Sequence, residues 1–231
     1  MTFICKEKKF IFIHLYKNAG SSIKSSLRKR VRNDLDVFSS VGIDKFDSLT
    51  FKIIRRLIDI NLYSPSNKII YEYYKNRTHL NYKTLEKYLK NIHEFKTFAI
   101  VRNPFSWQVS QYKFMMSNPK LPHHKFIRDL NFNEYIKWRC ARQNKVTQTS
   151  YLSSIENTFK ISKLIKIEDL NNEWVNILKW IDIPYVELAH KNVTQEDDQE
   201  YKKFYDNESS EILINNFRED FKNFNYSCSL K

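Results

Sequence analysis

The chain alternates between short apolar runs and segments whose apolar residues recur every three or four positions. Two apolar runs stand out, 10–15 and 95–101, and each leads through a short polar turn into a segment of helical periodicity. Runs of this kind are typical of strands buried on both faces of a parallel sheet. After the first run, Ile23, Leu27 and Val31 recur every four residues and predict a helix with one apolar stripe.

The same patterns predict the remaining elements. Strands are expected over 68–73 and 159–167, and helices over 51–58, 82–89, 104–116, 126–138, 168–180, 197–204 and 209–221. Asn103 should cap the helix that Pro104 begins. We therefore expect an α/β fold with a central parallel sheet flanked by helices, resembling P-loop NTPases, and a helical C-terminal part. Because no linker or repeat interrupts the chain, residues 1–231 are expected to form a single domain.

The turn after the first strand has the features of an anion site. Free N–H groups at a helix start and the helix dipole both favour negative charge. Lys17 adds a full charge, Gly20 would let a ligand approach the backbone, and Ser21 or Ser22 could cap the helix. The chain has only 2 glycines, so the GxxxxGK and GxGxxG phosphate loops are excluded. An ordinary strand-to-helix turn with a surface lysine remains the alternative.

Three other positions carry candidate chemistry. Arg102 follows the second apolar run, and with Ser110 it could bind a second anion, unless a nearby carboxylate engages it. His79 lies between a predicted strand and a predicted helix and could act as a general base, the alternative being an exposed loop histidine. His123 and His124 lack a third metal ligand at a diagnostic spacing and are expected in a surface loop.

Composition narrows the class of protein. The net charge is +13, which favours an anionic partner, although a solvated lysine-rich surface would give the same value. We expect no nucleic-acid partner because neither a recognition helix nor a stacking motif is evident. No apolar run approaches the ~20 residues of a membrane helix, and peripheral membrane contact stays open. The 3 distant cysteines fit no disulfide framework or zinc site and favour a reducing cytoplasm.

Two stretches resemble a known family. His14-Leu-Tyr-Lys-Asn-Ala-Gly-Ser-Ser22 resembles the 5′-phosphosulfate loop of sulfotransferases that use 3′-phosphoadenosine 5′-phosphosulfate (PAPS). Arg102-Asn-Pro104, with Ser110 beyond, resembles their 3′-phosphate motif. The carbohydrate branch, with Golgi-type and bacterial members, is the most similar, and the resemblance continues through 168–170, 190–192 and 205–226. Tyr16, Ser21, Ser106 and Trp107 depart from the usual motif residues.

The resemblance implies a function and residue roles. It implies sulfuryl transfer from PAPS, without a metal, to a hydroxyl of a saccharide or glycolipid. Lys17 would stabilise the leaving phosphate and His79 would be the base. The remaining cofactor-binding residues would be Asn18, Ala19, Gly20, Ser21, Ser22, Arg102, Ser110 and Lys191. The alternative is a catalytically inactive module of the same fold that binds a nucleotide or an anionic glycan.

Overall fold

The computed structural model describes residues 2–35, 79–143, 145–189 and 200–230. The predicted helix 51–58, the predicted strand 68–73 and Lys191 lie outside these ranges. The chain divides into two compact units. The first unit comprises residues 1–100 and 151–192, and the second unit comprises residues 101–150 and 193–231.

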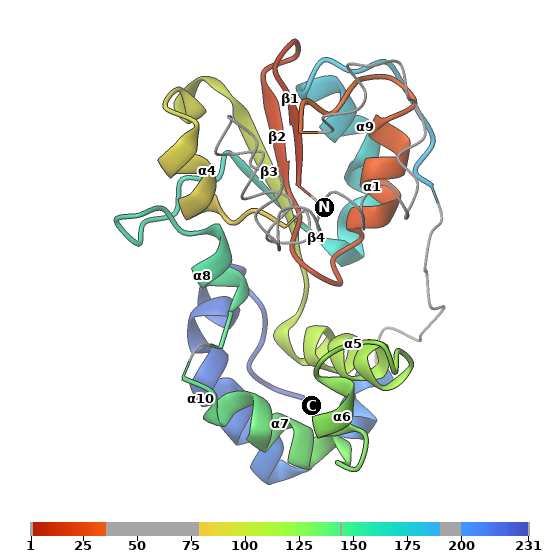
Figure 1. The fold of residues 1–231 in the computed structure, drawn as a ribbon, viewed down its shortest axis with the longest axis vertical. Helices are drawn as coiled ribbons and strands as arrows, with labels where there is room; N and C mark the ends of the chain where they lie inside the picture. Colours follow the sequence, from red (N-terminus) through yellow and green to blue (C-terminus); the bar gives the residue numbers. More distant parts are fainter. Residues whose placement is uncertain (1, 36–78, 144, 190–199, 231) are drawn as a thin grey trace, which may run out of the picture. The chain divides into compact units, whose positions relative to one another are not determined.

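A four-stranded sheet forms the centre of the first unit (Figure 1). The strand order is β1 (Phe3–Cys5), β2 (Phe10–Ile13), β3 (Lys96–Val101) and β4 (Lys163–Lys166). β2 and β3 pair in parallel, as predicted, whereas β1 pairs antiparallel with β2. The sequence did not indicate β1, because three residues are too few to show a period. The sheet is thus mixed rather than wholly parallel.

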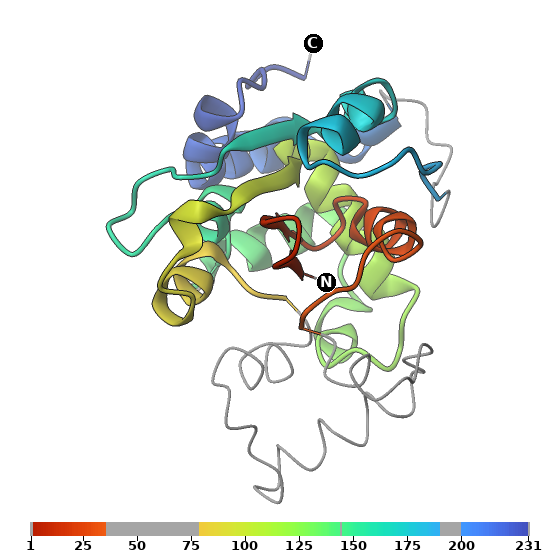
Figure 2. The same ribbon diagram turned by 90° about the horizontal axis from the view of Figure 1, so that it is seen from above.

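Helices cover the two faces of this sheet (Figures 1 and 2). On one face, α1 (Gly20–Leu27) and α9 (Leu170–Trp180) pack against Phe12 and Phe98, which alternate with residues of the opposite face. The helix α4 (Tyr82–Tyr88) lies on the other side. All four residues of β2 are buried, which explains its uninterrupted apolar sequence. Two 3-10 helices, η2 (Ile92–Glu94) and η3 (Ile167–Asp169), precede β3 and α9.

The second unit is helical. It contains α5 (Pro104–Met116), α6 (His124–Ile127), α7 (Phe132–Ala141), the 3-10 helix η4 (Glu200–Phe204) and α10 (Asn207–Asn223), together with the start of α8 (Gln148–Leu152). Its core joins α5, α7 and α10 through large aromatic and aliphatic side chains: Phe105, Trp107, Tyr135, Ile136, Leu213, Phe217 and Phe221. Asn103 caps α5 by accepting from the Phe105 N–H, as predicted.

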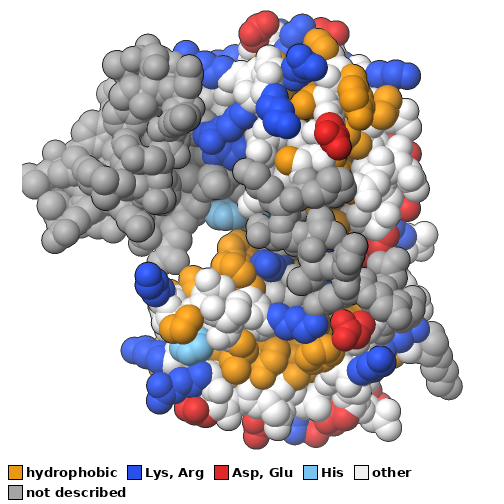
Figure 3. Space-filling model, turned by 90° about the vertical axis from the view of Figure 1, so that its right-hand side faces the viewer, with side chains coloured by type: hydrophobic (Ala, Val, Ile, Leu, Met, Phe, Trp, Pro, Cys, Tyr) orange, Lys and Arg blue, Asp and Glu red, His pale blue; other side chains and the backbone are white. Residues whose placement is uncertain are grey.

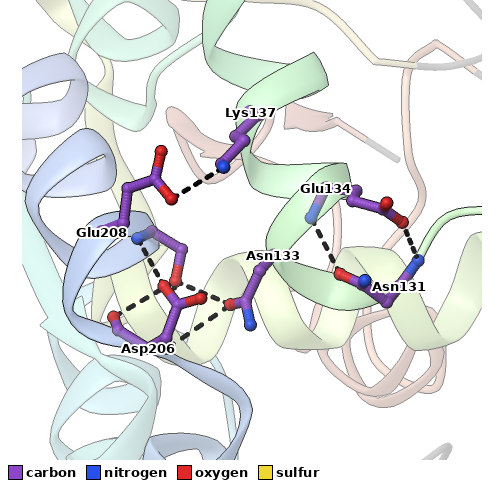
Figure 4. Close-up of polar contacts among 7 residues, drawn as sticks. Asn131, Asn133, Glu134, Lys137, Asp206 and Glu208 are labelled. Atoms are coloured by element: carbon purple, nitrogen blue, oxygen red, sulfur yellow. Dashed lines mark hydrogen bonds and ion pairs between the residues drawn. The ribbon is translucent and has the colours of Figure 1, made fainter.

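Two capping boxes define where α7 and α10 begin (Figure 4). The prediction of one helix over 126–138 was wrong, because Asn131 and Glu134 cap a new helix after α6 has ended. The second box uses Asp206 and Ser209, and the Ser209 hydroxyl also donates to Asn133 of α7 over 2.7 Å. These polar contacts fix the register of α7 against α10.

Two further predictions need correction. The strand expected over 159–167 is restricted to β4, and Phe159 makes only an isolated bridge with Ser153. The segment expected as a helix over 197–204 is a 3-10 helix within its described part, residues 200–204. For 159–167 the alternation was read over too long a window.

Candidate functional site

The turn between β2 and α1 has a strained backbone. Lys17 and Ala19 adopt positive φ angles of 67° and 52°, a conformation that residues other than glycine rarely take. The helix begins at Gly20, and within the described ranges the N–H groups of Gly20 and Ser21 donate to no acceptor. Left-handed residues followed by unengaged N–H groups are the backbone pattern found in anion-binding turns. Such a pattern is suited to an anion.

The predicted serine cap of α1 was wrong. Ala19, in the left-handed conformation, is the N-cap residue and provides no side-chain hydrogen bond. Ser21 and Ser22 occupy the second and third positions of Gly20–Leu27, so neither can cap the first turn. Ser21 is exposed and Ser22 is buried, which makes the Ser21 side chain the more accessible to a ligand.

A buried asparagine holds the turn against the sheet. Asn18 is fully buried, and its Nδ2 donates to the carbonyl of Ile100 over 2.9 Å. Its own N–H donates to the carbonyl of Leu15 over 3.3 Å. The turn is therefore tied at its centre to the end of β3, which fixes the backbone geometry described above.

His79 lies beside the residues that lead into this turn. Its ring centroid is 4.6 Å from that of His14 and 5.6 Å from that of Tyr16. The next residue, Leu80, is held through both its N–H and its carbonyl by the buried hydroxyl of Thr2, at 3.0 and 3.2 Å. The alternative of an exposed loop histidine is wrong, because His79 is half-buried and anchored.

One hydrogen bond determines the protonation pattern of His79. Nδ1 of His79 lies 3.2 Å from the carbonyl oxygen of His14. A carbonyl only accepts, so Nδ1 carries the proton and Nε2 keeps its lone pair. Burial, with smaller contributions from His14 and Lys24, lowers the pKa of His79 to about 3, so the ring is neutral at pH 7. A neutral imidazole with a lone pair on Nε2 can accept a proton.

A second imidazole, that of His14, is buried directly after β2. Burial and then the Lys24 charge lower the pKa of His14 to about 3, and Nδ1 has no partner among the described residues. The ring of His14 lies where a side chain on Gly20 would project. Gly20 is thus required by an internal contact, a role that the sequence did not indicate.

The second unit holds Arg102 through both its backbone and its side chain. The Arg102 N–H donates to Oε1 of Gln148 over 3.0 Å, and Nε2 of Gln148 donates to the Arg102 carbonyl over 2.7 Å. Nε of Arg102 donates to the Ser106 hydroxyl over 2.7 Å. Ser106 and Ser110 are four residues apart on α5 and share one face of that helix.

Sequence reasoning missed two of these residues. Ser106 was noted only as a departure from the family motif, although its four-residue spacing from both Arg102 and Ser110 was an available signal. Gln148 gave no local signal, because it is 46 residues from Arg102. Only the folded structure shows that Gln148 holds the backbone of Arg102.

Two properties concern the described part of the chain only. Residues 2–35, 79–143, 145–189 and 200–230 contain no group of three or more His, Cys, Asp or Glu side chains that could hold a metal ion. Within the same ranges no helix has both the length and the apolar character needed to cross a bilayer.

Comparison with known proteins places the chain in a family. A family model described as Sulfotransferase family matches residues 1–227, almost the whole sequence. No curated protein and no solved structure gave a significant match. The match confirms the predicted sulfotransferase family, and the mixed α/β fold is consistent with it. The chain therefore belongs to the sulfotransferase family.

Proposed function

We propose that the protein transfers a sulfuryl group from PAPS to a hydroxyl of a carbohydrate or glycolipid. One observation carries this proposal: in the first unit, a neutral histidine contacts the residues that lead into the candidate anion-binding turn. His79 bonds to the His14 carbonyl and touches Tyr16, and Lys17 follows directly. Sulfuryl transfer needs these two functions side by side, a base for the acceptor and a cradle for the leaving phosphate.

The turn fits the phosphosulfate end of PAPS. The N–H groups of Gly20 and Ser21 would donate to the 5′-phosphate, helped by the left-handed residues before them. The Lys17 ammonium would neutralise the charge that grows on the bridging oxygen as the bond to sulfur breaks. The part of Asn18 would be indirect, since its side chain anchors the turn to Ile100.

His79 would take the acceptor proton. Nε2 carries the lone pair, so it accepts the proton of the acceptor hydroxyl while that oxygen bonds to sulfur and the adenosine 3′,5′-bisphosphate leaves. A pKa of about 3 makes the free imidazole a weak base. An anionic donor next to the ring favours the imidazolium, so we expect donor binding to raise the pKa of His79.

Arg102 and Ser110 would bind the 3′-phosphate, the group that distinguishes PAPS from ATP. A guanidinium whose Nε is held by Ser106 keeps a defined orientation, which suits paired hydrogen bonds to phosphate oxygens. Lys191 is proposed as a further donor contact on the resemblance alone, since it lies outside the described residues.

The acceptor class rests on the carbohydrate-branch resemblance and on charge. Basic residues outnumber acidic ones by 39 to 26. Figure 3 shows Lys and Arg side chains over the face that it presents, with fewer Asp and Glu side chains between them. Such a surface attracts anionic ligands, which include the donor and acidic glycans.

Transfer from PAPS labelled on its sulfate to a panel of glycans and glycolipids tests the proposal. We expect Lys17→Ala and Arg102→Ala to abolish transfer in folded protein. Two control variants each remove an exposed charge: Lys29→Ala in the first unit matches Lys17→Ala, and Arg218→Ala in the second unit matches Arg102→Ala. Both controls should leave transfer unchanged. Calorimetry with adenosine 3′,5′-bisphosphate identifies the inactive binding module, which would bind the nucleotide yet transfer nothing. Wild-type protein that neither transfers nor binds would refute the proposal.

A further inference from the structure

The backbone of Arg102 is held by a side chain that is distant in the sequence. Arg102 is the first residue after β3, where the chain leaves the sheet. The carboxamide of Gln148 accepts from the Arg102 N–H and donates to the Arg102 carbonyl, over 3.0 and 2.7 Å. A neighbouring strand would offer the same pair of hydrogen bonds. The fully buried Gln148 side chain therefore replaces a strand partner at this point.

The position of Gln148 is set in turn by a carboxylate on α10. The two oxygens of Asp220 accept from the N–H groups of Gln148 and Thr149, over 2.9 and 2.7 Å. Asp220 is fully buried, and burial raises its pKa while the bonds to Thr149 and Gln148 act in the opposite direction. Nδ2 of Asn223, one turn further along α10, donates to the Thr149 hydroxyl over 3.3 Å. α10 thus fixes the start of α8.

The far end of Arg102 is also fixed. Its Nε donates to the hydroxyl of Ser106, the third residue of α5. With the backbone held by Gln148 and Nε held by Ser106, the direction of the guanidinium is determined at two points. Bidentate binding of a phosphate depends on such alignment, because small displacements weaken both hydrogen bonds together.

We propose that Gln148, held in place by Asp220, is a positioning residue that directs Arg102 at the 3′-phosphate of the donor. This inference rests on the proposed function, since it takes from it the role of Arg102. Neither Gln148 nor Asp220 would contact the nucleotide. Their effect reaches the ligand through Arg102, so it should be confined to the part of the ligand that Arg102 binds.

Two nucleotides separate a positioning role from a general structural one. Calorimetry on the full chain gives the affinities for adenosine 3′,5′-bisphosphate and for adenosine 5′-monophosphate, and their ratio measures the preference for the 3′-phosphate. Gln148→Leu should lower this preference about tenfold, the equivalent of one or two lost hydrogen bonds, and leave the monophosphate affinity unchanged. Asp220→Asn should act in the same direction but more weakly. Gln143→Leu, at an exposed glutamine in the loop before α8, should keep the wild-type preference.

The outcomes distinguish this inference from the proposed function. The positioning role is refuted if Gln148→Leu keeps the preference for the 3′-phosphate while Arg102→Ala loses it. It is also refuted if Gln148→Leu weakens the affinity for both nucleotides equally. Should Gln148→Leu fail to fold by circular dichroism, Gln148→Glu retains the shape and the acceptor but cannot donate to the Arg102 carbonyl, and the same expectation applies to it. A wild-type protein without any 3′-phosphate preference would instead contradict the proposed role of Arg102 and with it the donor assignment.

Discussion

The imidazole of His14 fills the space into which a side chain on Gly20 would project. A Cβ atom at residue 20 would overlap Cδ2 and Nε2 of His14, far inside contact distance. The same ring lies against His79, with the centroids 4.6 Å apart. The glycine at the start of α1 therefore makes room for a histidine that packs against the proposed base.

The contact between Gly20 and His14 predicts that adding one methyl group at residue 20 lowers the stability of the fold. Gly20→Ala should lower the free energy of unfolding by about 1–3 kcal/mol, because the buried ring cannot move aside without disturbing its neighbours. Urea denaturation measures the loss. Ser21→Ala, at the next and exposed position, serves as the control and should change stability little.

A double mutant tests the cause. His14→Ala removes the ring that a methyl group on residue 20 would strike, so the two substitutions together should cost less than the sum of each alone. Strict additivity would show that the His14 contact does not explain the requirement for glycine.

Buried His14 and half-buried His79 together predict a loss of stability in mild acid. Both have a pKa of about 3 in the folded protein against an ordinary value of 6.5, so the unfolded chain binds more protons between these limits. Stability should therefore fall as pH drops below 6.5, by about 2 kcal/mol per histidine between pH 7 and 5. Ordinary carboxyl groups remain largely ionised in this window. Urea denaturation at several pH values measures the slope.

The slope of stability against pH should depend on whether both imidazoles, those of His14 and His79, are present. His79→Gln removes one titrating group and can still donate to the His14 carbonyl, so the dependence between pH 7 and 5 should be roughly halved. An unchanged slope in this variant, or a flat wild-type profile, would contradict the buried neutral state of the two rings.

His79→Gln also tests the proposed base directly. The amide keeps a donor for the His14 carbonyl but cannot take a proton, so we expect transfer to fall about 10²–10⁴-fold. The affinity for adenosine 3′,5′-bisphosphate should change little, because the base acts on the acceptor. His93→Gln, at an exposed histidine of the same unit, is the matched control and should retain full activity. Retained transfer in His79→Gln would exclude His79 as the base.

Local patterns predicted the elements whose determinants are contiguous. β2 is buried on both faces and appears as an uninterrupted apolar run, and β3 is apolar from Phe98 to Val101. Asn103 with Pro104 starts α5 through bonds within a few residues. The turn at Lys17, the candidate base His79 and Arg102 were identified because each stands next to such an element. In contrast, the prediction of a single helix over 126–138 failed at Asn131. The apolar spacing continues past this residue, but Asn131 caps the start of a new helix.

What the tertiary structure alone decided are the contacts between distant residues. The sequence marked Gly20 as unusual, but the contact that requires it, with the ring of His14 just after β2, arises only through packing. The tautomer of His79 depends on a carbonyl 65 residues away, and the orientation of Arg102 depends on Gln148, 46 residues away, which Asp220 holds across a further 72. Such hydrogen bonds form only once the chain has folded. The sequence around one partner therefore does not predict which distant residue the other partner is.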